Sequence, residues 1–132
     1  MDMTPEFMAL TGVLVLAVIQ ILWAAVARTS ELGVAWNAGP RDDAVPPPGK
    51  LAGRLIRAQA NLFETLPIFA TLVIMSYVTG HDGALTALGA HLYFFGRLIY
   101  LPLYVFGAPY VRSLVWLVSL AGLLMVLAAL FI

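Results

Sequence analysis

Long apolar runs make up most of the chain, and polar residues interrupt them at only a few places. The runs at about 7–28 and 110–132 carry charged side chains only near one end, whereas those at about 52–79 and 84–107 contain polar residues in their interior. A helix needs about 20 mainly apolar residues to cross a membrane. The pattern therefore predicts four membrane-spanning helices.

Composition points to the same class of protein. Of the 132 residues, 62% are hydrophobic and only 11% are charged, which is typical of an integral membrane protein. Because four spans use nearly all of the chain, we expect one all-α, four-helix transmembrane domain over 1–132 that contacts the lipid bilayer. The net charge of zero gives no support for a nucleic-acid partner, and without Cys the chain offers no thiol of its own.

The basic residues predict an orientation. They flank the loop at about 29–51 and the turn near 107–109, or lie inside the helices, and none lies near either terminus or in the turn at 79–84. By the positive-inside rule, the first and third loops lie in the cytoplasm and both termini lie on the opposite side.

The two interrupted spans each carry a polar stripe at helical spacing. Spacings of three, four and three residues place on one face of the first helix Arg54, Arg57, Asn61 and Glu64. Spacings of four, three and four do the same in the second helix for Tyr93, Arg97, Tyr100 and Tyr104. Ionisable groups inside a bilayer face the bundle interior or a water-filled cavity, so we expect both stripes to face inward.

Arginine outnumbers acid in this region. The arginines at one depth of the predicted bundle are Arg28, Arg54, Arg57, Arg97 and Arg112. They meet a single carboxylate, Glu64, together with one amide and the phenols. Arginine binds carboxylates with two parallel hydrogen bonds, so the excess predicts a small anionic ligand that enters from the cytoplasm. The two isolated histidines make no metal site.

Three motifs carry a resemblance to a known family. They read "RLIRAQANLFETLP" in the second span, "RLIYLPLY" in the third and "APYVRS" before the fourth. In these motifs the chain resembles bacterial-type members of the MAPEG family, the membrane-associated proteins in eicosanoid and glutathione metabolism. The resemblance covers essentially the whole chain. One departure is Thr65, where some eicosanoid-forming members have tyrosine.

The resemblance implies a homotrimer of four-helix subunits in a bacterial inner membrane, with glutathione as co-substrate bound between neighbouring subunits. The residues it implies as glutathione contacts are Arg57, Asn61, Glu64, Arg97, Tyr100 and Tyr104, with Arg54 and Arg28 as further contacts. It implies Arg112 as the catalytic residue that stabilises the glutathione thiolate, because a nearby cation lowers the pKa of a thiol; Arg28 is the other arginine that the sequence leaves open for this role. The second substrate would be a lipophilic electrophile or hydroperoxide.

Three functions are consistent with the sequence. The first is a glutathione-dependent transferase or peroxidase, and the second is a non-catalytic MAPEG-like protein that binds a lipid or glutathione. The third is a small four-helix proton-coupled multidrug transporter that uses Glu64, although an arginine-rich site disfavours a cation exporter. Arg57 and Glu64 could also form a purely structural interhelical pair.

Overall fold

The computed structural model describes residues 2–132 and is built from helices. They are α1 (Pro5–Leu32), the short α2 (Val34–Ala38), α3 (Lys50–Val78), α4 (Ala84–Val105) and α5 (Pro109–Ala129). All but α2 are long and apolar enough to cross a membrane. The prediction of an all-α protein with four membrane-spanning helices is confirmed.

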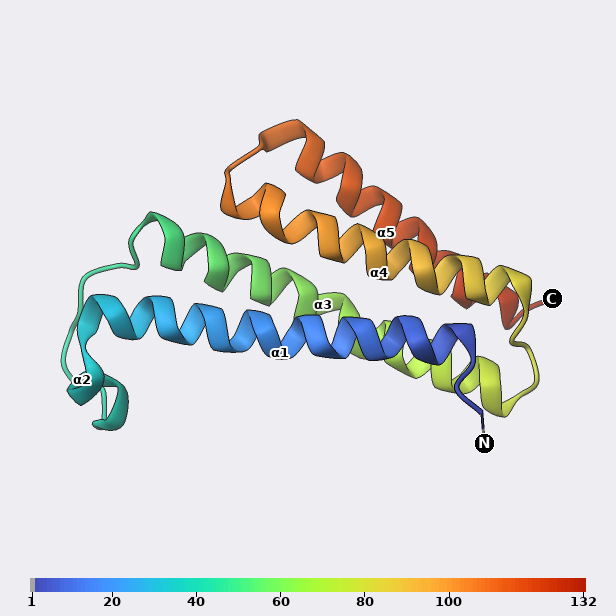
Figure 1. Ribbon diagram of the computed structural model, residues 1–132, viewed down its shortest axis with the longest axis horizontal. Helices are drawn as coiled ribbons and strands as arrows, with labels where there is room; N and C mark the ends of the chain where they lie inside the picture. Colours follow the sequence, from blue (N-terminus) through green and yellow to red (C-terminus); the bar gives the residue numbers. More distant parts are fainter. Residues whose placement is uncertain (1) are drawn as a thin grey trace.

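The four long helices form two antiparallel pairs (Figure 1). α1 lies beside α3, and α4 lies beside α5; the two pairs lie close together toward the end that holds both termini and spread apart toward the end with α2 and the α4–α5 turn. We call this second end the arginine-rich end, because Arg28, Arg54, Arg57 and Arg112 lie toward it. A pocket lined by side chains of α3, α4 and α5 lies toward this end.

Glycine brings α4 and α5 into close contact. A Cβ atom added to Gly122 on α5 would lie 2.7 Å from the backbone nitrogen of Tyr93 and would also collide with the carbonyl oxygen of Gly89 on α4. A Cβ atom on Gly96 would lie 2.8 Å from Ser119 Cβ. Small residues let helix backbones approach closely in membranes, so these positions fix how α5 lies on α4.

The helices bury two apolar clusters. The larger one includes Val13, Leu62, Phe69, Tyr93 and Val126, and thus joins all four long helices. A smaller cluster near the arginine-rich end joins only three helices, through residues such as Leu16, Leu55 and Leu101. α5 takes no part in the smaller cluster, and its first turns lie apart from α3 (Figure 1).

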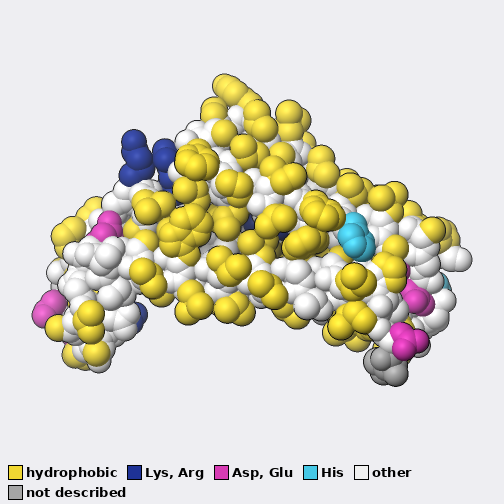
Figure 2. Space-filling view, viewed as in Figure 1, with side chains coloured by type: hydrophobic (Ala, Val, Ile, Leu, Met, Phe, Trp, Pro, Cys, Tyr) yellow, Lys and Arg dark blue, Asp and Glu magenta, His cyan; other side chains and the backbone are white. Residues whose placement is uncertain are grey.

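Apolar side chains also cover the outside of the bundle. On α1, Val15, Val18 and Leu22 are about half exposed. Hydrophobic atoms dominate the face in Figure 2, and most of the visible Lys and Arg atoms lie toward its left end. Such a surface suits lipid rather than water. Together with the four spans, it makes this an integral, multi-pass membrane protein.

An ion pair organises the first loop. α1 continues past residue 28 to Leu32, which places Arg28 Nη1 3.1 Å from Glu31 Oε1 one turn later. Glu31 Oε2 accepts a hydrogen bond from the Gly49 backbone nitrogen at 2.8 Å, and Arg28 Nη2 donates to the Pro46 carbonyl at 2.6 Å. The pair thereby holds the proline-rich segment against the end of α1 just before α3 begins.

Candidate functional site

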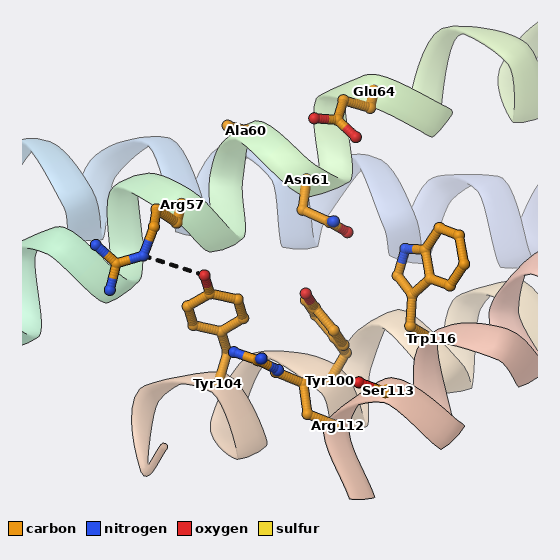
Figure 3. A pocket seen from close by; sticks show the side chains of 9 residues that line it. All are labelled: Arg57, Ala60, Asn61, Glu64, Tyr100, Tyr104, Arg112, Ser113 and Trp116. Atoms are coloured by element: carbon orange, nitrogen blue, oxygen red, sulfur yellow. Dashed lines mark hydrogen bonds between the residues drawn. The ribbon is translucent and has the colours of Figure 1, made fainter. Parts of the chain in front are cut away.

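A polar pocket of about 460 Å³ opens at the arginine-rich end between α3, α4 and α5. Its lining side chains, drawn in Figure 3, are Arg57, Ala60, Asn61, Glu64, Tyr100, Tyr104, Arg112, Ser113 and Trp116. Small-molecule sites have volumes of about 300–1,000 Å³. Six of the nine residues predicted from the sequence therefore line one cavity of suitable size.

One wall of the pocket comes from α3. Arg57, Asn61 and Glu64 recur at helical spacing, and Ala60 leaves open space beside them. Arg57 Nε donates a hydrogen bond to the Tyr104 hydroxyl at 3.1 Å (Figure 3), which links this wall to α4. Glu64 lies one turn beyond Asn61 and makes no ion pair within residues 2–132, so its carboxylate is available to a ligand.

The tyrosines of α4 form the floor. The rings of Tyr100 and Tyr104 are tilted against each other with centroids 5.6 Å apart. The guanidinium carbon of Arg112, from the first turn of α5, lies 4.6 Å from the centre of the Tyr104 ring. Tyr104 thus contacts two cations, because Arg57 binds its hydroxyl group and Arg112 lies over the face of its ring.

Arg97 lies behind this floor and does not line the pocket. Its side chain is only 2% exposed, and its Nη1 donates to Asn61 Oδ1 at 2.7 Å. Its guanidinium carbon lies 4.5 Å from the centre of the Tyr100 ring. Arg97 therefore touches two lining residues while remaining covered by them.

The other two predicted contacts, Arg54 and Arg28, also lie outside the pocket. Arg54 Nη1 donates to the Val105 carbonyl at 2.9 Å and so caps the end of α4. Arg28 forms the loop contacts with Glu31 and Pro46, and it lines a different, more apolar depression between α1 and α3. Neither side chain contacts the pocket within the single chain, and their roles toward a ligand stay predictions.

Comparison with known proteins gives one match. Residues 7–132 match the MAPEG family, which is nearly the whole chain. The chain belongs to the MAPEG family. No curated protein and no solved structure matches it. Membership supports a membrane role in glutathione-related transfer or peroxidase chemistry at the level of the family.

Two residues that line the pocket of this MAPEG protein were given no role from the sequence. Ser113 and Trp116 line the pocket from α5, one and four residues after Arg112. The spacing of four residues places Trp116 on the same helix face as Arg112, and that signal was present in the sequence. Ser113 ends the motif "APYVRS", in which only Arg112 was given a role, and Trp116 lies in an apolar run that already predicts a membrane span.

The contacts of Thr65 show its structural role. Its hydroxyl lies 2.7 Å from the hydroxyl of Tyr93, whose ring stacks on Phe69 with centroids 4.0 Å apart. Tyr93 is buried in the larger apolar cluster and not in the pocket. The position at which some eicosanoid-forming members have tyrosine therefore serves to join α3 to α4 in this chain.

The chemistry of the pocket favours an organic anion. Two guanidinium groups, Arg57 and Arg112, face one carboxylate, Glu64, so the charged side chains that line it sum to one positive charge. Hydroxyl, indole and amide groups supply further hydrogen bonds. Within residues 2–132, no three His, Cys, Asp or Glu side chains lie together in a way that could hold a metal ion.

Proposed function

We propose that the pocket binds glutathione and that the protein is a transferase or peroxidase acting on lipophilic electrophiles. The observation that carries the proposal is the lining itself: two arginines, one glutamate, an asparagine and two tyrosines surround about 460 Å³ in a membrane protein of the MAPEG family. Glutathione at neutral pH carries two carboxylates and one ammonium group, and its net charge of about −1 complements this lining.

Each charged residue would bind a different group of glutathione. Arg57 and Arg112 offer bidentate donors to anionic groups, and Glu64 offers an acceptor to the ammonium group. Tyr100 and Tyr104 add hydroxyl groups near the middle of the pocket (Figure 3). In this arrangement Arg112 lies at the start of α5, where it would stabilise the sulfur after the thiol loses its proton.

The reaction would use the thiolate as a nucleophile. Attack on an electrophilic carbon forms a C–S bond, and the electron pair passes to a leaving group or to an acceptor that is then protonated. Attack on a hydroperoxide breaks the O–O bond, which leaves an alcohol and an oxidised sulfur that a second thiol converts to a disulfide. Trp116, the only large apolar side chain lining the pocket apart from the tyrosines, would contact the lipophilic substrate.

The proposal includes the assembly and its place. We infer a homotrimer in a bacterial inner membrane, with the arginine-rich end and the loop at about 29–51 in the cytoplasm, where the thiol is supplied. Because the chain lacks Cys, single substitutions Asp42→Cys and Asp82→Cys would test the orientation. An impermeant thiol reagent added to intact cells should label the second variant and not the first.

Glutathione binding to the purified protein in detergent tests the function, followed by ultraviolet absorbance of the bound thiolate. We expect saturable binding, a thiolate signal at neutral pH, and turnover of a generic lipophilic electrophile or hydroperoxide. Arg57→Ala should lose binding, whereas Arg41→Ala, which removes an exposed loop arginine, should keep it. Binding without turnover would favour the non-catalytic alternative, and absence of binding would show that the glutathione proposal is wrong.

A further inference from the structure

Arg97 is a buried cation without a carboxylate partner. Within residues 2–132 the side chain forms no ion pair, and its Nε and Nη2 groups are buried without any hydrogen-bond acceptor. Its single hydrogen bond runs from Nη1 to Asn61 Oδ1. Burying a charged group without a paired partner costs free energy, and the one hydrogen bond of Arg97 goes to a residue that lines the pocket.

That contact fixes which end of the Asn61 amide faces the ligand. A guanidinium group has only donors, so the amide must direct its oxygen toward Arg97. Asn61 lines the pocket, and because its Oδ1 is turned toward Arg97, the Nδ2 N–H groups form the side of the amide left for a ligand. Tyr100, whose ring covers the guanidinium at 4.5 Å, is 5% exposed and keeps the ligand off Arg97 itself.

We propose that Arg97 is a positioning residue that orients Asn61 as a hydrogen-bond donor, so that this part of the pocket selects an acceptor group on the ligand. With glutathione, the acceptor is a carboxylate or a peptide carbonyl and not the ammonium group. The inference rests on the proposed function for the identity of the ligand, but the Arg97–Asn61 geometry stands without it.

Asn61→Asp tests the direction of the contact. Aspartate keeps an oxygen for Arg97 and even pairs with its charge, so the fold is preserved, but the atom facing the pocket changes from a donor to an acceptor. We expect the affinity for glutathione to fall by about tenfold or more. A higher affinity in Asn61→Asp would show that Asn61 accepts from the ligand's ammonium group and would overturn the proposal.

A double-mutant cycle tests whether Arg97 acts through Asn61. We expect Arg97→Met to weaken glutathione binding in the wild-type background and to have little further effect in Asn61→Ala, because the two residues act as one unit. Arg97→Lys, which keeps a donor, should restore part of the affinity. Equal losses in both backgrounds would mean that Arg97 acts on the ligand independently of Asn61, and the proposal would fail.

A measurement without ligand separates this proposal from the proposed function. The chain has two asparagines, Asn37 and Asn61, so selective ¹⁵N-asparagine labelling gives two pairs of side-chain NH₂ signals. In Arg97→Met we expect the Asn61 amide to become mobile while the Asn37 amide, which donates to Thr29 Oγ1 at 2.7 Å, is unchanged. If the Asn61 signal stays the same, the positioning role is wrong, even if glutathione binds; if glutathione does not bind, a mobile Asn61 still supports it.

Discussion

At the scale of single residues, the proposed role of Arg112 in stabilising the thiolate can be tested separately from glutathione binding. It is half-buried, comes from the first turn of α5 and lies 4.6 Å from the centre of the Tyr104 ring. Removing a cation beside a thiol raises the pKa of that thiol, because the anion loses a favourable charge interaction. In Arg112→Ala we therefore expect glutathione to bind while its thiolate forms only at higher pH.

The measurement is the thiolate absorbance of bound glutathione as a function of pH. We expect the midpoint in Arg112→Ala to rise by about one unit or more, and one unit corresponds to about 1.4 kcal/mol. Arg112→Lys keeps the charge and should shift the midpoint less. An unchanged midpoint in Arg112→Ala would remove this residue from the reaction and leave Arg28 as the remaining arginine to test.

Trp116 carries a second prediction at this scale. It lines the pocket on the side away from Arg57 (Figure 3), so Trp116→Leu should weaken contact with a lipophilic substrate and leave glutathione affinity unchanged. A lost aromatic contact of about 1 kcal/mol corresponds to a roughly fivefold higher KM for the electrophile. Trp23→Leu on α1, outside the pocket, is the matched control, and a weaker glutathione affinity in Trp116→Leu would contradict the assignment.

Residue spacing predicted part of the site, but it did not predict which side chains are exposed to the pocket and which are buried behind it. The stripes placed Arg57, Asn61 and Glu64 on one face, and all three line the pocket. The same rule grouped Arg97 with Tyr100, although Arg97 is covered by its neighbours and only reaches Asn61. Spacing defines a face of a helix, but the tilt of the neighbouring helix decides which side chain on that face is reached by a ligand.

At the scale of helices, the approach of α5 to α4 positions half of the pocket. Gly122→Ala would place a methyl group against the Tyr93 backbone nitrogen and the Gly89 carbonyl, and backbone atoms cannot move aside as side chains do. Overpacking of this kind destabilises by about 1–3 kcal/mol. We expect a lower thermal unfolding midpoint in detergent, together with weaker glutathione binding because Arg112 and Trp116 are displaced.

Gly83→Ala is the matched control. An added Cβ atom at Gly83 meets nothing within 4 Å, and its φ of 172° is extended backbone that any residue adopts. The midpoint of that variant should match the wild type. If Gly122→Ala unfolds at the same temperature as Gly83→Ala, then α4 and α5 are not packed through Gly122 as described.

The sequence predicted the helices better than it predicted their ends. Hydropathy identified the four spans because lipid imposes one length and one composition on each of them. The end of α1 also depends on contacts from far along the chain, because Arg28 and Glu31 hold Pro46 and Gly49 against it. Such contacts are not part of the local pattern from which helix ends are predicted.

At the scale of the whole molecule, Arg57 and Glu64 are exposed in the single chain. Glu64 follows Lys50, the first residue of α3, by fourteen positions, which places it about 20 Å along the helix. Even low estimates for one charge at mid-helix in lipid are about 2.5 kcal/mol. The open side of the pocket must therefore face another chain or a water-filled space, and not the acyl chains.

A trimer would enclose that side, and native mass spectrometry of the detergent-solubilised protein tests it. We expect a complex of three chains of 14.2 kDa each, with more of the trimer surviving detergent dilution when glutathione is present, because a ligand that binds only the assembled state stabilises it. Denatured protein, which should give the single-chain mass, is the control. A stable dimer would favour the transporter interpretation of Glu64, and a monomer that binds glutathione with full affinity would show that one chain completes the site.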